Sequence, residues 1–204
     1  MTLPKPGLTP PGSVPSAFEP CSLAQDAGAS GSRAIFLVGP RCSGKSTVGG
    51  LLAARLGFAA HDTDLMVVRK ARRSIAEIVA GEGWEAFRAL EAEALIEAAA
   101  VGGVVAGGGG IVLAPENRRL MRASGLVFYL AASLQTLYER MSRAHNAGFR
   151  PALRGTDALS EMAAVLAERE ALYLECAHHR LNADKPADAV AREACRLISG
   201  GSSK

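Results

Sequence analysis

Cysteine is scarce in this chain, with only 4 among 204 residues. The cysteines lack the close pairing of a zinc site and the density of a small disulfide-stabilised secreted domain. They are Cys21, Cys42, Cys176 and Cys195. This usage is typical of a reducing compartment, and we expect a cytoplasmic protein.

A large excess of one charge is also missing. The 23 Lys and Arg residues nearly balance the 20 Asp and Glu residues, which leaves a formal net charge of +3. Without a sequence-wide positive field, we expect no nucleic-acid partner. The composition, 49% hydrophobic and 21% charged, excludes a disordered or fibrous chain. The length fits one compact, enzyme-sized domain, which we expect to be a monomer.

No hydrophobic run is suited to a membrane. The uncharged stretch from Ala98 to Pro115 has 18 residues, the length of a short spanning helix. Six of those residues are glycine, and each costs a helix about 1 kcal/mol relative to alanine. The first residues also lack a continuous apolar segment behind a positive start, so we predict no secretory signal and no membrane contact.

The chain divides into a Pro-rich segment and a region of alternating strand and helix patterns. Residues 1–32 hold six of the ten prolines, which predicts a flexible tail, either without a role or acting as a docking segment. Short apolar runs predict strands at 34–38, 58–61, 104–106, 126–130 and 180–183. Helical spacing predicts helices at 44–57, 75–80, 84–100, 115–122, 134–143, 157–177 and 186–198. This alternation predicts an α/β domain over 33–200, before a short tail at 201–204, with a parallel sheet covered on both faces.

The segment from Gly39 to Ser46 reads Gly-Pro-Arg-Cys-Ser-Gly-Lys-Ser, which matches the phosphate-binding motif G-x-x-x-x-G-K-[ST]. An apolar strand pattern precedes it and a helical pattern follows it, as the motif requires. Backbone N–H groups would surround phosphate at the positive end of the helix, Lys45 would reach the β and γ phosphates, and Ser46 would offer its hydroxyl to Mg²⁺. We therefore predict binding of a nucleoside triphosphate. Cys42 is either a small residue that fits the loop or a redox-sensitive thiol.

Asp62 and Asp64 follow the second predicted strand. Residues two apart in an extended chain point to the same side, so we expect both carboxylates at the sheet edge where ligands bind in open α/β folds. One could belong to the magnesium shell while the other accepts a proton from an alcohol. A solvated acidic turn is the alternative.

Two arginines on helical patterns are candidates for an anion site. Arg169 lies within an apolar stripe, where a cation is costly unless an anion meets it. That anion is either a structural carboxylate, such as Glu93 or Asp157, or an anionic substrate. Arg88 flanks the stripe of its own helix and has glutamates three residues away on either side, so judged alone it is more typical of a helix surface.

Two loops complete the candidate segments. Gly107–Gly110 directly follow the third strand, where glycine either permits the close approach of a ligand or forms a flexible loop. The segment at about 144–156 follows Arg143 and carries Arg150. It is either a mobile lid that brings cationic charge onto the phosphates or an exposed basic loop.

Taken together, these motifs resemble shikimate kinase over about residues 34–198. The matching landmarks are Gly39–Thr47, Asp62–Asp64, Phe87–Arg88, Gly108–Gly110, Arg150–Pro151, and Arg169 before Leu172–Tyr173. The resemblance implies a three-layer P-loop kinase fold of the nucleoside-monophosphate-kinase-like type, with a five-stranded parallel sheet of order 2-3-1-4-5 between helices and a mobile lid. It also implies ATP-dependent phosphorylation of the 3-hydroxyl of shikimate, in the pathway to chorismate and the aromatic amino acids.

The resemblance assigns roles residue by residue. The residues that match the nucleotide site are Gly39, Pro40, Arg41, Cys42, Ser43, Gly44, Lys45, Ser46, Thr47, Arg143 and Arg150, with Arg143 beside adenine. The residues that match the shikimate site are Asp64, Arg88, Gly108, Gly109, Gly110 and Arg169. Ser46 and Asp62 match the Mg²⁺ side, and the catalytic matches are Lys45, Asp64 and Arg150.

The resemblance implies ATP and shikimate as small-molecule partners. Two arginines that share one carboxylate would bind it through charge-assisted, often bidentate hydrogen bonds, which orient the ring as well as hold it. Two alternatives stay open: a degenerate binding domain without turnover, and a related kinase that acts on gluconate.

Overall fold

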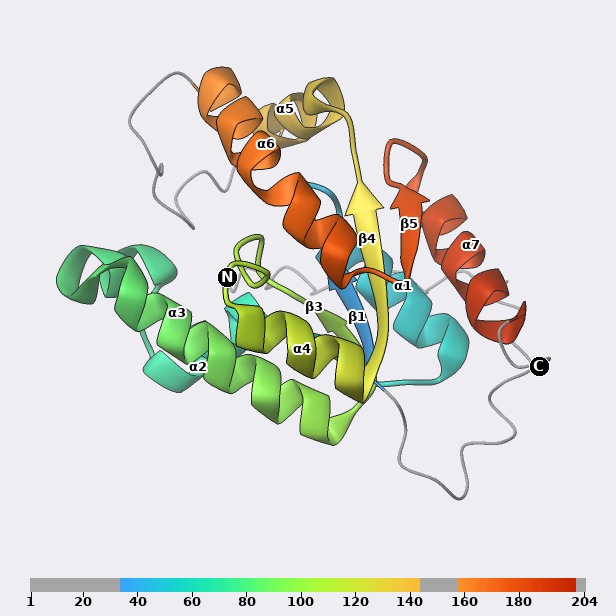
Figure 1. Ribbon diagram of the computed structural model, residues 1–204, viewed down its shortest axis with the longest axis horizontal. Coiled ribbons are helices and arrows are strands. Elements are labelled where there is room, and N and C mark those ends of the chain that lie inside the picture. Colours follow the sequence, from blue (N-terminus) through green and yellow to red (C-terminus); the bar gives the residue numbers. More distant parts are fainter. Residues whose placement is uncertain (1–33, 144–157, 201–204) are drawn as a thin grey trace, which may run out of the picture.

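The computed structural model describes residues 34–143 and 158–200, and its centre is a parallel sheet (Figure 1). The sheet has five strands in the order β2-β3-β1-β4-β5, which confirms the predicted order. The strands are β1 (Ala34–Val38), β2 (Ala60–Asp62), β3 (Val104–Ala106), β4 (Gly125–Ala131) and β5 (His179–Asn182). The expected tail at 1–32, the lid at 144–156 and residues 201–204 lie outside the described residues.

Helices cover both faces of the sheet, as predicted for a three-layer α/β fold. One apolar cluster joins the strands to α1 (Lys45–Leu56) and α7 (Ala187–Gly200). The cluster on the opposite face joins the strands to α3 (Ile75–Val101), α4 (Pro115–Ser124) and α6 (Ala158–Cys176), and Figure 1 shows these three helices on one side of the sheet. None of the helices in 34–143 and 158–200 is long and apolar enough to cross a membrane.

The central strand β1 supplies side chains to both clusters. Ile35 and Leu37 pack toward α1 and α7, while Ala34, Phe36 and Val38 pack toward the helices of the other face. All five residues are buried because successive side chains of a strand point to opposite faces. This double burial explains the continuous apolar run at the start of the domain.

The carboxyl ends of three adjacent strands meet at one edge of the sheet. The register pairs Leu37 of β1 with Ala106 of β3, and Ala106 with Asp62 of β2. The loop after β1, the glycine-rich loop after β3 and the aspartates after β2 therefore begin side by side. This is the edge at which ligands bind in open α/β sheets.

The chain around β2 differs from the prediction. The strand begins at Ala60 rather than at residue 58, and α2 (Thr63–Ala71) begins directly after Asp62. The expectation that Asp62 and Asp64 share one side of an extended segment was therefore wrong. Asp62 is the N-cap of α2, and its Oδ1 accepts hydrogen bonds from the backbone N–H groups of Asp64 (3.0 Å) and Leu65 (3.2 Å). Aspartate favours this position because its side chain satisfies amide donors of the first helical turn.

Helix α3 covers both helices predicted at 75–80 and 84–100. It runs from Ile75 to Val101 with a break at Gly83, whose φ of 83° and ψ of 174° are not helical. Glycine adopts this conformation at little cost, so the helix changes direction there. The part of α3 after the break carries Arg88 alongside the sheet.

Candidate active site

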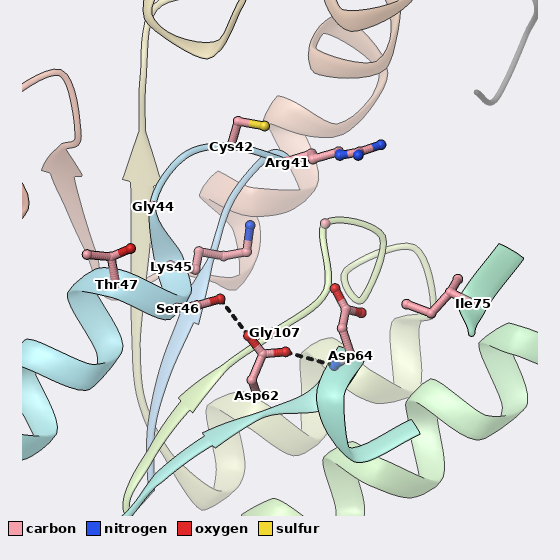
Figure 2. Close-up of a pocket in the computed structure, with 11 residues that line it drawn as sticks. Arg41, Cys42, Gly44, Lys45, Ser46, Thr47, Asp62, Asp64, Ile75 and Gly107 are labelled. Atoms are coloured by element: carbon pink, nitrogen blue, oxygen red, sulfur yellow. Dashed lines mark hydrogen bonds between the residues drawn. The ribbon is translucent and has the colours of Figure 1, made fainter. Parts of the chain in front are cut away.

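The phosphate loop connects β1 to α1 (Figure 2). Gly39 and Gly44 have φ values of 147° and 94°, which would strain any residue with a side chain. A Cβ on Gly39 would also lie 2.7 Å from the carbonyl oxygen of Leu130 on β4. Lys45 is buried at the start of α1, and its Nζ donates to the carbonyl oxygens of Gly39 (2.9 Å) and Pro40 (2.7 Å). The loop therefore has the backbone geometry and the positioned lysine that its motif predicts.

A cavity of about 270 Å³ opens beside this loop. It is bounded by the loop itself, the beginnings of α1 and α2, and the glycine-rich loop after β3. The predicted site residues that line it are Arg41, Cys42, Gly44, Lys45, Ser46, Thr47, Asp62, Asp64 and Gly109. The structure thus brings most of the predicted nucleotide residues and both aspartates around one space.

Ser46 and Asp62 lie next to each other in the cavity. Ser46 Oγ donates a 2.5 Å hydrogen bond to Asp62 Oδ2, while Asp62 Oδ1 caps α2, as the dashed lines of Figure 2 show. A hydroxyl and a carboxylate held together offer the oxygen ligands that Mg²⁺ prefers. No group of three or more His, Cys, Asp or Glu residues in the described part of the chain could hold a metal ion. Ser46 and Asp62 would therefore need phosphate oxygens and water to complete a magnesium shell, which is the usual arrangement in kinases.

The glycine-rich loop after β3 is held by two neighbouring helices. Thr63 Oγ1, at the start of α2, accepts a 2.9 Å hydrogen bond from the N–H of Gly108. On α6, Arg169 Nη1 (3.3 Å) and the hydroxyl of Tyr173 (2.5 Å) both donate to the carbonyl oxygen of Gly109. Burial raises the pKa of the Tyr173 hydroxyl, so it remains a neutral donor. These contacts make the loop an ordered, buried backbone surface beside the cavity.

Arg88 of α3 packs against Gly110 of this loop. A Cβ on Gly110 would come within 3.0 Å of three atoms of the Arg88 guanidinium, so only glycine leaves room for the arginine. The guanidinium also pairs with Glu91, which is fully buried one helical turn later, and lies 5.2 Å from the centroid of the Phe87 ring. The helix glutamate at spacing three is therefore a partner of Arg88. The arginine also adjoins Gly110, another residue of the predicted shikimate site.

Arg169 is buried on the core side of α6, as its place in the apolar stripe predicts; it is 8% exposed. Of the two carboxylates considered as its structural partners, Glu93 pairs with Lys70 and Asp157 lies outside the described residues. The Nε of Arg169 has no hydrogen-bond acceptor among the described residues, since Glu168 Oε1 is 3.9 Å away. Leaving a buried donor unsatisfied is costly, so this guanidinium favours an anionic ligand.

Arg140 contacts the phosphate loop, although the sequence analysis did not single it out. It lies on α5 (Leu134–Arg143), where its Nη1 donates to the carbonyl oxygen of Ser43 (3.2 Å) and its Nη2 to that of Ala183 (2.7 Å). One guanidinium therefore joins the loop to the segment after β5. The contact with Ser43 spans 97 residues of sequence, so no local pattern could have indicated it.

Two other arginines belong to the predicted nucleotide site. Arg143, expected beside adenine, is the last residue of α5, and its side chain is 79% exposed and pairs with Glu139 at 3.7 Å. Arg150, expected on the lid, lies outside the described residues. Both assignments stay predictions.

Comparisons with known proteins identify the family. A sequence model of the family described as shikimate kinase matches residues 41–199. The chain belongs to the shikimate kinase family. The shikimate kinase of Oleidesulfovibrio alaskensis is 48% identical over 166 residues, which cover 81% of this chain and 96% of that protein. Shikimate kinase 2 of Sodalis glossinidius is 49% identical over 156 residues, which cover 76% of this chain and 90% of the relative.

Solved structures of shikimate kinases share the fold. The shikimate kinase of Acinetobacter baumannii, solved in complex with shikimate, has a TM-score of 0.79 and 32% sequence identity, and the match covers 85% of this chain and 96% of that one. The shikimate kinase of Aquifex aeolicus has a TM-score of 0.71 and 29% identity, covering 83% and 98% of the two chains. These matches confirm the resemblance to shikimate kinase and the P-loop kinase fold that it implies.

Proposed function

We propose that this member of the shikimate kinase family transfers the γ-phosphoryl group of ATP to the 3-hydroxyl of shikimate, giving shikimate 3-phosphate and ADP. The family places this reaction in the biosynthesis of aromatic amino acids. The phosphates of ATP occupy the loop from Gly39 to Thr47. Shikimate lies between Asp64 and the surface formed by Arg88, Gly108–Gly110 and Arg169.

The observation that carries this assignment is the buried guanidinium of Arg169 beside the carbonyl of Gly109. Arg88 packs against the next residue, Gly110, so two cations adjoin neighbouring residues of one loop. One carboxylate can accept hydrogen bonds from both, and charge-assisted arginine pairs fix orientation as well as affinity. The carboxylate of shikimate supplies this anion and satisfies the open Nε of Arg169.

Asp64 lines the same cavity as the phosphate loop and is the proposed base. Its carboxylate accepts the proton of the 3-hydroxyl as the oxygen attacks the γ-phosphorus. The bond from that phosphorus to the bridging oxygen breaks, and ADP leaves with the electron pair. Lys45 donates hydrogen bonds to the phosphate oxygens in place of the loop carbonyls. Catalysis then comes mainly from alignment and electrostatics, as in other phosphoryl transfers.

Ser46 and Asp62 are the proposed residues on the Mg²⁺ side. Their oxygens are already 2.5 Å apart, with Ser46 in the phosphate loop itself and Asp62 just before α2. Bound there with ATP, the ion would offset the negative charge of the phosphates. Activity that is lost with a chelator and restored by added Mg²⁺ tests this assignment.

The remaining proposals concern the surroundings of the site. Arg150 and Arg143 are proposed to reach the nucleotide, with the segment at about 144–156 acting as the lid. The protein is proposed to act as a monomer, and light scattering tests this. The described cysteines, Cys42, Cys176 and Cys195, are all free, which supports a reducing, cytoplasmic location.

Replacing Arg169 tests the acceptor site. Because its proposed partner is the carboxylate of shikimate, Arg169→Ala should raise the KM for shikimate by about 100-fold or more and leave the KM for ATP nearly unchanged. Coupled ADP release is measured with shikimate, with gluconate and without an acceptor. Arg196→Ala, at an exposed position on α7, is the matched control. Unchanged shikimate kinetics in Arg169→Ala, or turnover with gluconate alone, would contradict the assignment.

Replacing Asp64 tests the proposed base. Asp64→Asn keeps the shape and removes the proton acceptor, so kcat should fall by about 10²- to 10⁴-fold. Circular dichroism before and after heating checks that the variant is folded. A folded Asp64→Asn variant with full activity rules out an essential carboxylate at this position.

A further inference from the structure

Helix α4 sends side chains to backbone carbonyl groups of two neighbouring segments. Asn117 Nδ2 donates to the carbonyl oxygen of Ile111 (3.0 Å), which follows the glycine-rich loop. At the far end of α4, one Nη of Arg122 lies 3.1, 3.2 and 3.5 Å from the carbonyl oxygens at the C-terminus of α6, those of residues 175, 176 and 177. The helix therefore contacts both the loop that carries Gly109 and the helix that carries Arg169.

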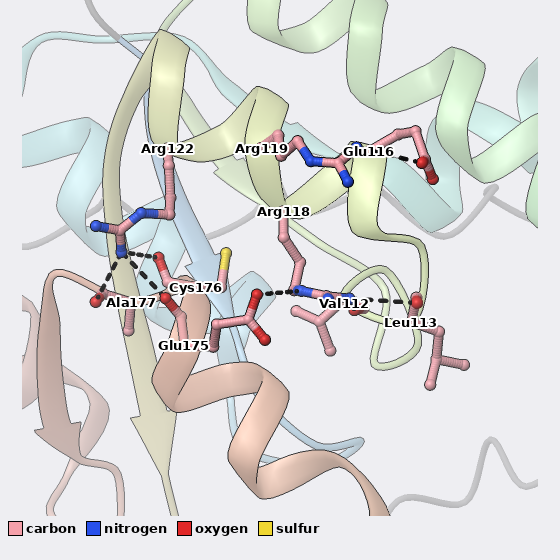
Figure 3. A network of polar contacts seen from close by, with 9 residues as sticks. All are labelled: Val112, Leu113, Glu116, Arg118, Arg119, Arg122, Glu175, Cys176 and Ala177. Carbon is pink, nitrogen blue, oxygen red and sulfur yellow. Dashed lines mark hydrogen bonds and ion pairs between the residues drawn. The ribbon is translucent and has the colours of Figure 1, made fainter.

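Arg118 joins these two segments through a single guanidinium (Figure 3). Its Nη1 donates to the carbonyl oxygens of Val112 (2.7 Å) and Leu113 (3.3 Å). Its Nε donates to Glu175 Oε1 at 3.0 Å, near the end of α6. The side chain of Arg118 is only 13% exposed and its two bonds to carbonyls are partly buried, whereas Glu175 is 58% exposed at the other end. Two partly buried backbone carbonyls and one helix carboxylate thus share the same donor residue.

The two segments joined by Arg118 are the two walls of the proposed carboxylate site. Gly109 and Gly110 lie just before Ile111, whereas Arg169 and Tyr173 lie six and two residues before Glu175 on α6. The Gly109 carbonyl already contacts Arg169 and Tyr173 across this gap. A shift of the loop relative to α6 would change the distance between the loop surface and the buried guanidinium.

We propose that Arg118 is a positioning residue for shikimate, holding the glycine-rich loop at a fixed place against α6 without touching the substrate. This inference rests on the proposed carboxylate site. The planar fork of arginine presents donors in several directions at once, which suits a bridge between three acceptors. Lysine has a compact ammonium on a flexible stem and cannot present that fork.

The test is the steady-state kinetics of Arg118→Ala, measured separately for shikimate and for ATP. Misplacing a binding group by about 1 Å can cost up to roughly 100-fold, so we expect the KM for shikimate to rise about 10- to 100-fold. The KM for ATP should stay within about twofold, because the phosphate loop is held by other contacts. Arg119→Ala is the matched control: the next residue of α4, 75% exposed, pairs only locally with Glu116 and should leave both constants unchanged.

Two further variants keep the test decisive if Arg118→Ala is poorly folded. Glu175→Gln alters the exposed end of the bridge and should raise the KM for shikimate by about threefold. Arg118→Lys should restore part of the lost shikimate affinity. Thermal unfolding of each variant shows whether a change in KM is explained by a loss of stability rather than by a displaced loop.

Three results would overturn the inference. The first is a folded Arg118→Ala variant whose KM for shikimate is unchanged while Arg169→Ala raises it. The second is an equal rise of both KM values that follows loss of stability, which would indicate only a general structural role. The third applies if Arg118→Ala does not fold: it is an unchanged KM for shikimate in both Arg118→Lys and Glu175→Gln. An unchanged KM in Arg169→Ala is a separate outcome, which refutes the proposed carboxylate site itself and the inference with it.

Discussion

Adding one methyl group at Gly110 should impair shikimate binding through Arg88. The Cβ of Gly110→Ala would lie within 3.0 Å of the guanidinium carbon and both terminal nitrogens of Arg88. The guanidinium would have to retreat by about 1 Å or more to reach van der Waals distance. It lies at the end of a flexible side chain, so the arginine moves rather than the sheet.

The expected loss follows from that displacement. A shift of about 1 Å in a group that positions the substrate can cost up to roughly 100-fold, so we expect the KM for shikimate to rise about 10- to 100-fold. Overpacking of one methyl group should cost about 1 kcal/mol, which lowers Tm by about 2–4 °C in a domain of this size. The enzyme should therefore stay folded at assay temperature while its acceptor affinity falls.

The assay is coupled ADP release with varied shikimate at saturating ATP, with Tm measured on the same samples. Gly81→Ala is the matched control, because this α3 position has open space around an added Cβ and alanine favours a helix. It should leave the KM for shikimate unchanged. Arg88→Ala shows the full effect of losing the guanidinium. If Arg88→Ala raises the KM and Gly110→Ala does not, the steric argument is refuted.

Two further predictions concern stability. Ser133 donates its N–H (2.9 Å) and its hydroxyl (3.0 Å) to Asp184, and the backbone hydrogen bond is the main reason that the pKa of this carboxyl is lowered from 3.8. A carboxyl group whose pKa is lowered by folding stabilises the fold at pH values above its pKa in the unfolded state. This stabilisation is lost as the pH falls through its pKa in the folded state. Asp184→Asn should therefore lower the free energy of unfolding at pH 7 and have little effect near about pH 2, measured by urea unfolding; an equal loss at both pH values would contradict this. Arg72 ends α2 with a φ of 53°, so Arg72→Gly should raise the free energy of unfolding by about 1 kcal/mol, whereas a similar gain in the control Arg72→Ala would show that backbone strain is not the cause.

Local patterns were sufficient for the central strand and the phosphate loop, whereas the strand order came from the resemblance to shikimate kinase. The apolar run of β1 is buried on both faces, so it leaves a continuous hydrophobic signal, and the glycines of the phosphate loop are required by its backbone conformation. Arg169 could be placed as a buried cation because the apolar stripe on either side of it identified the core face of α6. In each case the deciding interactions lie within one element and the residues next to it.

Other features depend on contacts that local patterns do not contain. Helix α2 was missed because residues 62–64, after the strand predicted at 58–61, were interpreted as extended chain. A signal was present, since aspartate before a helical segment is a typical N-cap. Arg140 acts through carbonyl groups of distant segments, and a carbonyl is present at every position, so the sequence carries no mark of the partner. Arg118 combines two nearby carbonyls with a glutamate 57 residues away, a pairing that no local pattern indicates. The glutamate partner of Arg88 could be anticipated from its spacing, but its complete burial could not.

If the nucleotide binds as proposed, the two carbonyl oxygens that hold Lys45 compete with its phosphates for the ammonium group. Without phosphate, the ammonium group is bound by Gly39 and Pro40 and is never a bare buried charge. An incoming phosphate must displace both hydrogen bonds, so the affinity for nucleotide reflects an exchange of partners rather than the full attraction between opposite charges. In the proposed reaction, Lys45 would return to these two carbonyl oxygens when ADP leaves, so its charge would have a ready partner during product release.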